Sequence, residues 1–199
     1  MKRSNVKNRT FKLVLLAMLI AILVVLGYVN IPMPVGLSIT FNMIPVAIAA
    51  IALGLPGSAI VGGAFGMISF LQCFNIFGSS PMGVALVGFS PFLMFVQRFV
   101  SRLLVGILTA LIYKGLRRVN TPLRCGITGF CAACLNTLFF MSLLVLLFGQ
   151  TEYMQNAMAG RGIFAYLVAS IGINATVEML VAALVTSAVG TALIKAKLV

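Results

Sequence analysis

Residues 90–118 read SPFLMFVQRFVSRLLVGILTALIYKGLRR, a long apolar run with two arginines in its middle. Pro91 suits the first turn of a helix, and the basic residues at the end of the stretch indicate a cytoplasmic end. With a rise of about 1.5 Å per residue, we expect Arg98 roughly 10 Å inside the outer end. Arg102 should lie one turn deeper on the same face, near the bilayer midplane. Intramembrane arginines are costly, so both should face a protein interior or an aqueous cavity and have an anionic partner.

The composition of the whole chain is that of an integral membrane protein. Of its 199 residues, 62% are hydrophobic and 8% are charged, and the mean hydropathy is +1.18. One compact helical bundle accounts for this length, and the sequence contains no nucleotide-binding loop. The formal net charge of +12 indicates topology rather than a nucleic-acid partner, because most of the fourteen basic residues fall on one side of the predicted membrane. These residues are Lys2, Arg3, Lys7, Arg9, Lys12, Lys114, Arg117, Arg118, Arg124, Lys195 and Lys197.

The same composition lacks the residue types from which most enzyme active sites are built. Histidine is absent and the chain has only two acidic residues, so histidine metal sites and Ser-His-Asp triads are excluded and carboxylate dyads are starved of parts. The pair Cys131-x-x-Cys134 lies in an apolar segment without histidine or a second such pair. We interpret these cysteines as small apolar side chains, and we expect neither enzymatic activity nor a metal or cofactor.

Six apolar segments predict an all-α bundle of six transmembrane helices, forming one domain in the cell membrane with both termini cytoplasmic. The segments are residues 11–29, 42–55, 57–73, 90–116, 123–148 and 162–194. The second and third are short, are separated at Leu55-Pro56-Gly57 and are rich in small residues. Short segments of this kind fit either a binding region or tight helix packing. The predicted outer connections are long, and long loops tend to be functional.

Several polar residues fall at membrane depth and should therefore converge inside the bundle. They are Gln97, Arg98 and Arg102 on the fourth segment, Asn136 and Thr137 on the fifth, and Asn174 and Glu178 on the sixth. A purely structural network would pair Arg102 with Glu178 and let Asn136 bond a neighbouring backbone group. One acid cannot neutralise both arginines, so a positive charge is left over. This surplus favours an anionic ligand near the outer end, at Arg98.

The chain resembles the S-components of energy-coupling factor (ECF) transporters, which are six-helix membrane proteins that capture vitamins at the outer face. The resemblance covers almost the whole chain. It is carried by Ala17-x-x-x-Ala21, residues 39–71, Arg102-Leu-Leu-Val-Gly106, Leu135-Asn136-Thr137 and Asn174-Ala-Thr-Val-Glu178. The pattern is most like the pantothenate branch, with riboflavin and folate next, and the carboxylate of pantothenate agrees with the surplus arginine. Residues 53–63 read LGLPGSAIVGG where the family pattern leads us to expect a Gly-Pro turn.

The resemblance implies that the chain binds a vitamin and is driven by partner proteins. The residues expected to contact or support the vitamin are Arg98 for its carboxylate, Gln97, Asn136 and Asn174 as polar contacts, and Arg102 with Glu178 as a supporting pair. Ala17 and Ala21 would form part of the surface that meets a transmembrane coupling subunit, whose partners are two ATPases. A self-sufficient small-molecule carrier remains the alternative from another class.

Overall fold

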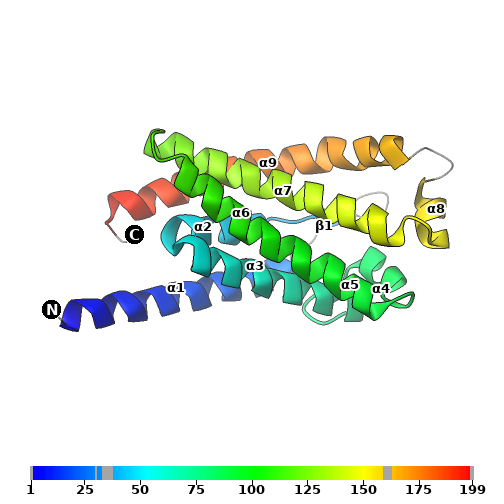
Figure 1. Ribbon diagram of the computed structural model, residues 1–199, viewed down its shortest axis with the longest axis horizontal. Coiled ribbons are helices and arrows are strands. Elements are labelled where there is room, and N and C mark those ends of the chain that lie inside the picture. The colour runs from blue at the N-terminus through cyan, green and yellow to red at the C-terminus, as the bar shows by residue number, and fades with distance from the viewer. Residues whose placement is uncertain (1, 30, 33–37, 159–162, 198–199) are drawn as a thin grey trace.

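The computed structural model describes residues 2–29, 31–32, 38–158 and 163–197, and it is built almost entirely of helices (Figure 1). The α-helices are α1 (Lys2–Tyr28), α2 (Met43–Ala52), α3 (Gly54–Leu71), α4 (Pro81–Val87), α5 (Pro91–Phe95), α6 (Ser101–Gly115), α7 (Thr121–Phe148), α8 (Glu152–Met158) and α9 (Ile163–Lys195). A 3-10 turn, η2 (Gln72–Phe74), follows α3, and a π-helical segment, η3 (Val96–Val100), joins α5 to α6. The predicted all-helical fold is therefore confirmed.

The loop between α1 and α2 contains one short departure from helical structure. Strands β1 (Ile31–Pro32) and β2 (Ser38–Ile39) pair antiparallel, with Ile31 opposite Ile39. The first of the long outer connections that the sequence predicts thus includes a two-residue ladder, and residues 33–37 lie outside the described part. The second outer connection, between the predicted segments 57–73 and 90–116, is also not entirely a loop, because it contains α4.

Five of the described helical segments are long and apolar enough to cross a membrane. They are Arg9–Tyr28, Gly54–Phe74, Pro91–Gly115, Thr121–Phe148 and Ala175–Lys195. The chain is therefore a multi-pass membrane protein, as predicted. The remaining predicted span corresponds to α2, which has only 10 residues and is about 15 Å long. A sixth full span stays a prediction, because a helix of this length covers about half of a hydrocarbon core.

The break between α2 and α3 falls earlier than predicted. We expected it at residues 55–57, but α2 ends at Ala52 and α3 begins at Gly54. Gly54 has a φ of +69°, a conformation that glycine adopts without a steric penalty. Pro56 lies in the first turn of α3, where its missing N–H removes no intrahelical hydrogen bond. The glycine rather than the proline therefore separates the two helices.

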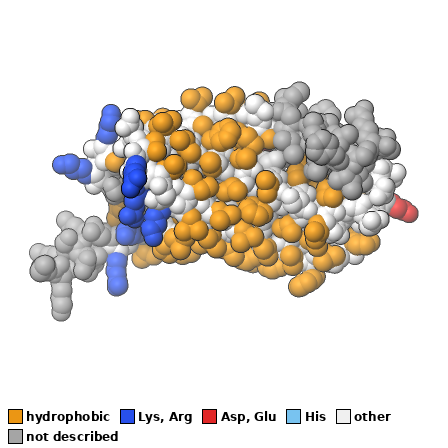
Figure 2. Space-filling view, turned by 45° about the horizontal axis from the view of Figure 1, so that its top comes forward, with side chains coloured by type: hydrophobic (Ala, Val, Ile, Leu, Met, Phe, Trp, Pro, Cys, Tyr) orange, Lys and Arg blue, Asp and Glu red, His pale blue; other side chains and the backbone are white. Residues whose placement is uncertain are grey.

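Charge and hydrophobicity divide the surface of the bundle into zones. Figure 1 shows both termini at the same end, and Figure 2 shows lysine and arginine side chains gathered at that end. Hydrophobic side chains cover the middle, and acidic side-chain atoms appear at the opposite end. We call the end with the termini the basic end and the other the outer end. Both termini share one side, as the predicted topology requires, and its cytoplasmic location remains a prediction.

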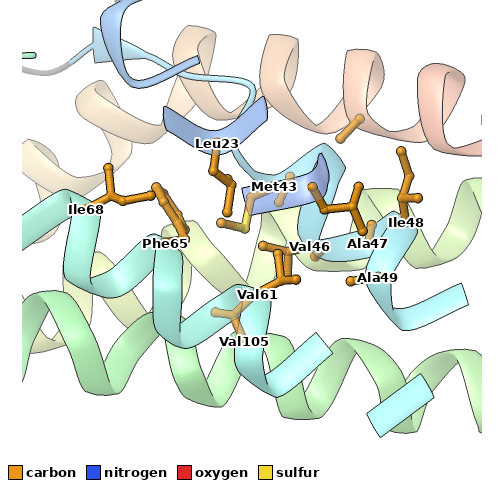
Figure 3. Close-up of a cluster of buried hydrophobic side chains, with 14 residues drawn as sticks. Leu23, Met43, Val46, Ala47, Ile48, Ala49, Val61, Phe65, Ile68 and Val105 are labelled. Carbon is orange, nitrogen blue, oxygen red and sulfur yellow. The ribbon is translucent and has the colours of Figure 1, made fainter. Parts of the chain in front are cut away.

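Helix α2 lies at the centre of the main hydrophobic core. Eight of its ten residues are buried, and it contacts α1, α3, α6, α7 and α9. Figure 3 shows Val46 of α2 beside Val61 of α3 and Val105 of α6, with Leu23 of α1 and Phe65 of α3 nearby. A helix that is apolar on all sides is found either in a protein core or across a membrane, and ten residues are too few to cross one. This surrounded position explains how a short helix can sit in the middle of the bundle.

Candidate functional site: a buried pair of arginines

The helix that carries both arginines changes its geometry where the first one lies. Ser90 caps α5, its Oγ accepting a hydrogen bond from the Leu93 N–H at 3.4 Å, and Pro91 occupies the first turn as predicted. The next five residues, Val96–Val100, form η3, which contains Gln97 and Arg98. The Ser101 hydroxyl donates to the carbonyl oxygen of Gln97 at 2.6 Å. A π-segment shifts the faces of the helix on its two sides, and such segments are frequent at functional sites.

Close contact with α3 fixes the backbone around the arginines. A Cβ atom added at Gly62 would lie 2.6 Å from the Arg102 carbonyl oxygen, and one added at Gly66 would lie 2.8 Å from the Phe99 Cα. Ser58 of α3 also donates a hydrogen bond to the carbonyl of Gly106 at 2.7 Å. The small residues of the predicted segment 57–73 fitted either a binding region or tight helix packing. These contacts support tight packing. This packing places the arginine backbone directly against α3.

Arg98 is held by hydroxyl groups. It is 5% exposed, its Nη1 donates to the Ser69 Oγ at 3.3 Å, and its Nη2 donates to the Ser80 Oγ at 3.0 Å. Ser80 also caps α4, accepting a hydrogen bond from the Gly83 N–H. A Cβ at Gly83 would lie 3.0 Å from the Arg98 Nη2, so glycine leaves room for the guanidinium. Helices α3 and α4 together therefore position Arg98.

Arg102 lies one turn further along and is also 5% exposed. Its Nη1 donates to the Ser101 Oγ at 3.0 Å and to the Arg98 carbonyl at 3.4 Å. Its Cζ atom lies 4.9 Å from the ring centre of Phe65 and 5.0 Å from that of Phe140. The Cζ atom of Arg98 is also 5.0 Å from the Phe140 ring centre. One aromatic ring thus contacts both guanidinium groups.

Neither guanidinium contacts a carboxylate among the residues that the structure describes. The Nε atoms of Arg98 and Arg102 are buried and lack hydrogen-bond partners within that part of the chain. Hydroxyl, carbonyl and aromatic groups stabilise a cation without neutralising it. A buried charge without a counter-ion is costly. The arrangement is therefore suited to accept an anion, and a carboxylate matches the planar guanidinium geometry.

The expected contact between Arg102 and Glu178 is absent from the described structure. The Glu178 carboxylate instead accepts a hydrogen bond at 2.6 Å from the backbone N–H of Thr40, which follows β2. A backbone donor in the first loop thus takes one oxygen of the Glu178 carboxylate, and the supporting role of the Arg102–Glu178 pair stays a prediction.

The predicted amides have different positions. Gln97 is fully buried, its Nε2 donates to the Phe140 carbonyl at 3.3 Å, and its Oε1 has no partner among the described residues. Asn136 lies one turn before Phe140 on α7, and its buried Oδ1 also lacks a partner in the described part of the chain. Asn174 belongs to α9, but its side chain is outside the described part. Gln97 therefore bonds the residue whose ring contacts both arginines, and Asn136 lies one helical turn from that residue.

The sequence did not reveal the residues that hold the arginines. These are Ser69, Ser80, Ser101, Phe65 and Phe140. Serines within apolar stretches could have indicated these contacts, because buried hydroxyl groups are almost always hydrogen-bonded. The aromatic residues gave no comparable signal, because the chain has 15 phenylalanines that look alike in the sequence.

A hydrophobic groove lies elsewhere, at the basic end between α7 and α9. It has a volume of about 560 Å³ and is lined by Pro122, Leu123, Gly126, Ile127, Phe130, Ala183, Leu184 and Ser187. It contains none of the predicted site residues. Its position and apolar lining exclude it as the anion site.

The small residues of α1 face away from the core. Ala17 and Ala21 are exposed, whereas Leu19 and Leu23 are buried in the main core. Exposed large residues, including Met18 and Ile22, flank the two alanines. The alanine face is therefore available to lipid or to another protein.

These features define an integral membrane protein with a buried, positively charged site. Residues 11–190 match the family described as ECF transporter, substrate-specific component. The chain belongs to this family, and the resemblance predicted from the sequence is confirmed. Proteins of this family are transport components rather than enzymes.

Two relatives are similar over nearly their whole length. The chain is 29% identical to the pantothenic acid transporter PanT of Lactococcus lactis subsp. cremoris, over 96% of this chain and 97% of the relative. It is 28% identical to the pantothenate transporter PanT of Leuconostoc mesenteroides subsp. mesenteroides, over 94% of each chain.

Proposed function

We propose that this chain is the high-affinity pantothenate-binding S-component of an ECF importer, with Arg98 as the main contact of the substrate carboxylate. The observation that carries the proposal is the pair of buried guanidinium groups without a carboxylate partner among the described residues. Family membership and the names of the two relatives support it. Gln97, Asn136 and Asn174 are the proposed polar contacts for the remainder of the ligand.

The chemistry of pantothenate fits this site better than that of a neutral ligand. A carboxylate would form charge-assisted hydrogen bonds with the unpartnered guanidinium nitrogens, which are about twice as strong as neutral hydrogen bonds. It would also remove part of the cost of two buried cations. Unpartnered amide oxygens at Gln97 and Asn136 would accept hydrogen bonds from hydroxyl or amide donors of the ligand.

The same proposal includes partner proteins. We assign the basic end to the cytoplasm from its excess of lysine and arginine. In this orientation Arg98 lies nearer to the outer side than Arg102, and uptake is powered by a transmembrane coupling subunit with two ATPases. The exposed Ala17 and Ala21 face of α1 is the proposed contact with the coupling subunit, since small residues permit close approach of helices.

A thermal-shift panel on the purified, detergent-solubilised chain tests the substrate. Pantothenate, riboflavin, folate, thiamine, biotin and pyridoxine are compared with a dye or aggregation readout, because the chain has no tryptophan. At a hundred times Kd, a ligand stabilises by about 2.7 kcal/mol, or about 5–10 °C for a chain of this size. We expect this shift with pantothenate alone. A shift in melting temperature with another vitamin, and none with pantothenate, would refute the assignment of pantothenate as the substrate.

Vesicle uptake tests the partners. The chain alone should bind pantothenate but not accumulate it, and accumulation should require the coupling subunit, the ATPases and ATP. Accumulation by the chain alone would contradict the S-component mechanism and favour a self-sufficient carrier.

A further inference from the structure

Phe140 occupies a special position in the arginine site. Its ring centre lies 5.0 Å from the Cζ atom of Arg98 and 5.0 Å from that of Arg102. Its carbonyl oxygen accepts a hydrogen bond from Gln97 at 3.3 Å. Phe65, by comparison, contacts only the Arg102 guanidinium among those of the described residues. Phe140 thus links α7 to every predicted binding residue of the arginine helix.

An aromatic ring is chemically suited to this position. Two like charges at membrane depth repel each other, and burial strengthens the repulsion. The negative face of a phenyl ring attracts both cations but carries no net charge. A carboxylate in the same place would form an ion pair with the guanidinium groups and occupy the hydrogen-bonding positions that a ligand needs. The ring therefore holds the arginines while leaving them able to bind an anion.

We propose that Phe140 is a positioning residue that holds Arg98 and Arg102 in the geometry that selects a carboxylate-bearing ligand over its neutral analogue. This inference rests on the proposed function. It predicts that removal of the ring damages recognition of the carboxylate and leaves the contacts to the rest of the ligand unchanged. A residue needed only for packing would affect charged and neutral ligands equally.

Isothermal titration with pantothenate and with pantothenol, its neutral alcohol analogue, separates these roles. In the full-length protein, Phe140→Leu should weaken pantothenate binding by about 5- to 100-fold, since two cation–π contacts are lost. Pantothenol affinity should change by less than about 2-fold, so that the selectivity ratio falls. Phe140→Tyr keeps a ring and should preserve the ratio. Phe139→Leu is the matched control, because it removes a neighbouring ring that packs against the main core instead.

Phe140→Met has a similar volume and provides a second test if the leucine variant does not fold. Unchanged selectivity in the leucine or methionine variant would overturn the role of Phe140 and leave the proposed function intact. Equal losses for both ligands would also overturn it, because they indicate packing alone. Failure of the unaltered protein to bind pantothenate would instead refute the proposed function, and this inference with it.

Discussion

Replacement of Arg98 by methionine should abolish ligand binding and stabilise the ligand-free protein. Methionine keeps a long, flexible side chain of comparable reach but carries no charge. The arginine is 5% exposed, and its Nε has no partner within the described structure. Its favourable contacts there include two hydrogen bonds to serine hydroxyls and one aromatic contact. The substitution therefore removes a poorly compensated charge from the interior.

The magnitudes follow from these contacts. A buried ion costs several kcal/mol in desolvation, and each of its two hydrogen bonds returns about 1.5–3 kcal/mol because the donor is charged. Replacement of buried charges by apolar side chains of similar volume is often neutral or stabilising by about 1–4 kcal/mol. We expect a net gain of about 1–2 kcal/mol in unfolding free energy, or a rise of about 2–8 °C in the melting temperature. Loss of one partner from a buried charge pair costs about 2–5 kcal/mol of binding energy. The Kd for pantothenate should therefore rise by about 30-fold to several thousand-fold.

The assay combines thermal unfolding of the ligand-free variant with calorimetric titration of pantothenate. Arg118→Met is the control, because Arg118 is exposed at the basic end and should change neither quantity. Pantothenate binding of normal strength in Arg98→Met would refute the assignment of Arg98. A large fall in melting temperature would refute the view that its charge is insufficiently compensated in the free protein.

Three further substitutions test the packing, the partner surface and the first loop. Gly62→Ala should destabilise by about 1–3 kcal/mol, because the new Cβ would lie 2.6 Å from a carbonyl oxygen of α6. Gly115→Ala, with nothing within 4 Å of its Cβ, should be neutral or stabilising in the same unfolding assay. Leucine at both Ala17 and Ala21 should leave pantothenate binding unchanged but stop ATP-driven uptake. Glu178→Leu should cost about 1–3 kcal/mol by leaving a backbone N–H without its acceptor, whereas Glu178→Gln keeps an acceptor and should cost less.

Each of these tests has a contradicting result. Equal stability of the two glycine variants would show that the α3–α6 contact is looser than described. Leu146→Phe enlarges an exposed residue of α7 and should leave uptake intact, so equal loss of uptake in this variant would remove the special role of α1. Equal destabilisation by leucine and glutamine at Glu178 would show that the hydrogen bond to Thr40 does not matter.

The sequence predicts the long helices well, because they follow from local patterns. Apolar runs identify the long helices, and helical periodicity places Arg98 and Arg102 on one face. Periodicity does not identify tertiary partners, however. Glu178 was expected at Arg102, but the first loop supplies a backbone N–H that only the folded chain brings near.

Other features of the site depend on three-dimensional contacts in the same way. Ser69 and Ser80 are distant from Arg98 in sequence, but in the folded chain their hydroxyl oxygens accept hydrogen bonds from its guanidinium. Both side chains are uncharged, so the sequence does not mark them as partners of an arginine. The π-helical geometry around Gln97 has no clear sequence signal, since the surrounding residues are ordinary helix formers. Phe140 is recognisable only when the two guanidinium groups are seen beside its ring.

A structure of the chain with pantothenate bound tests the central claim most directly. We predict the carboxylate oxygens within about 2.7–3.2 Å of guanidinium nitrogens of Arg98 or Arg102, on the outer side of the bundle. The contact should include a nitrogen that now lacks a partner. A pantothenate carboxylate bound away from both arginines, with Arg98 still bonded only to Ser69 and Ser80, would contradict the account.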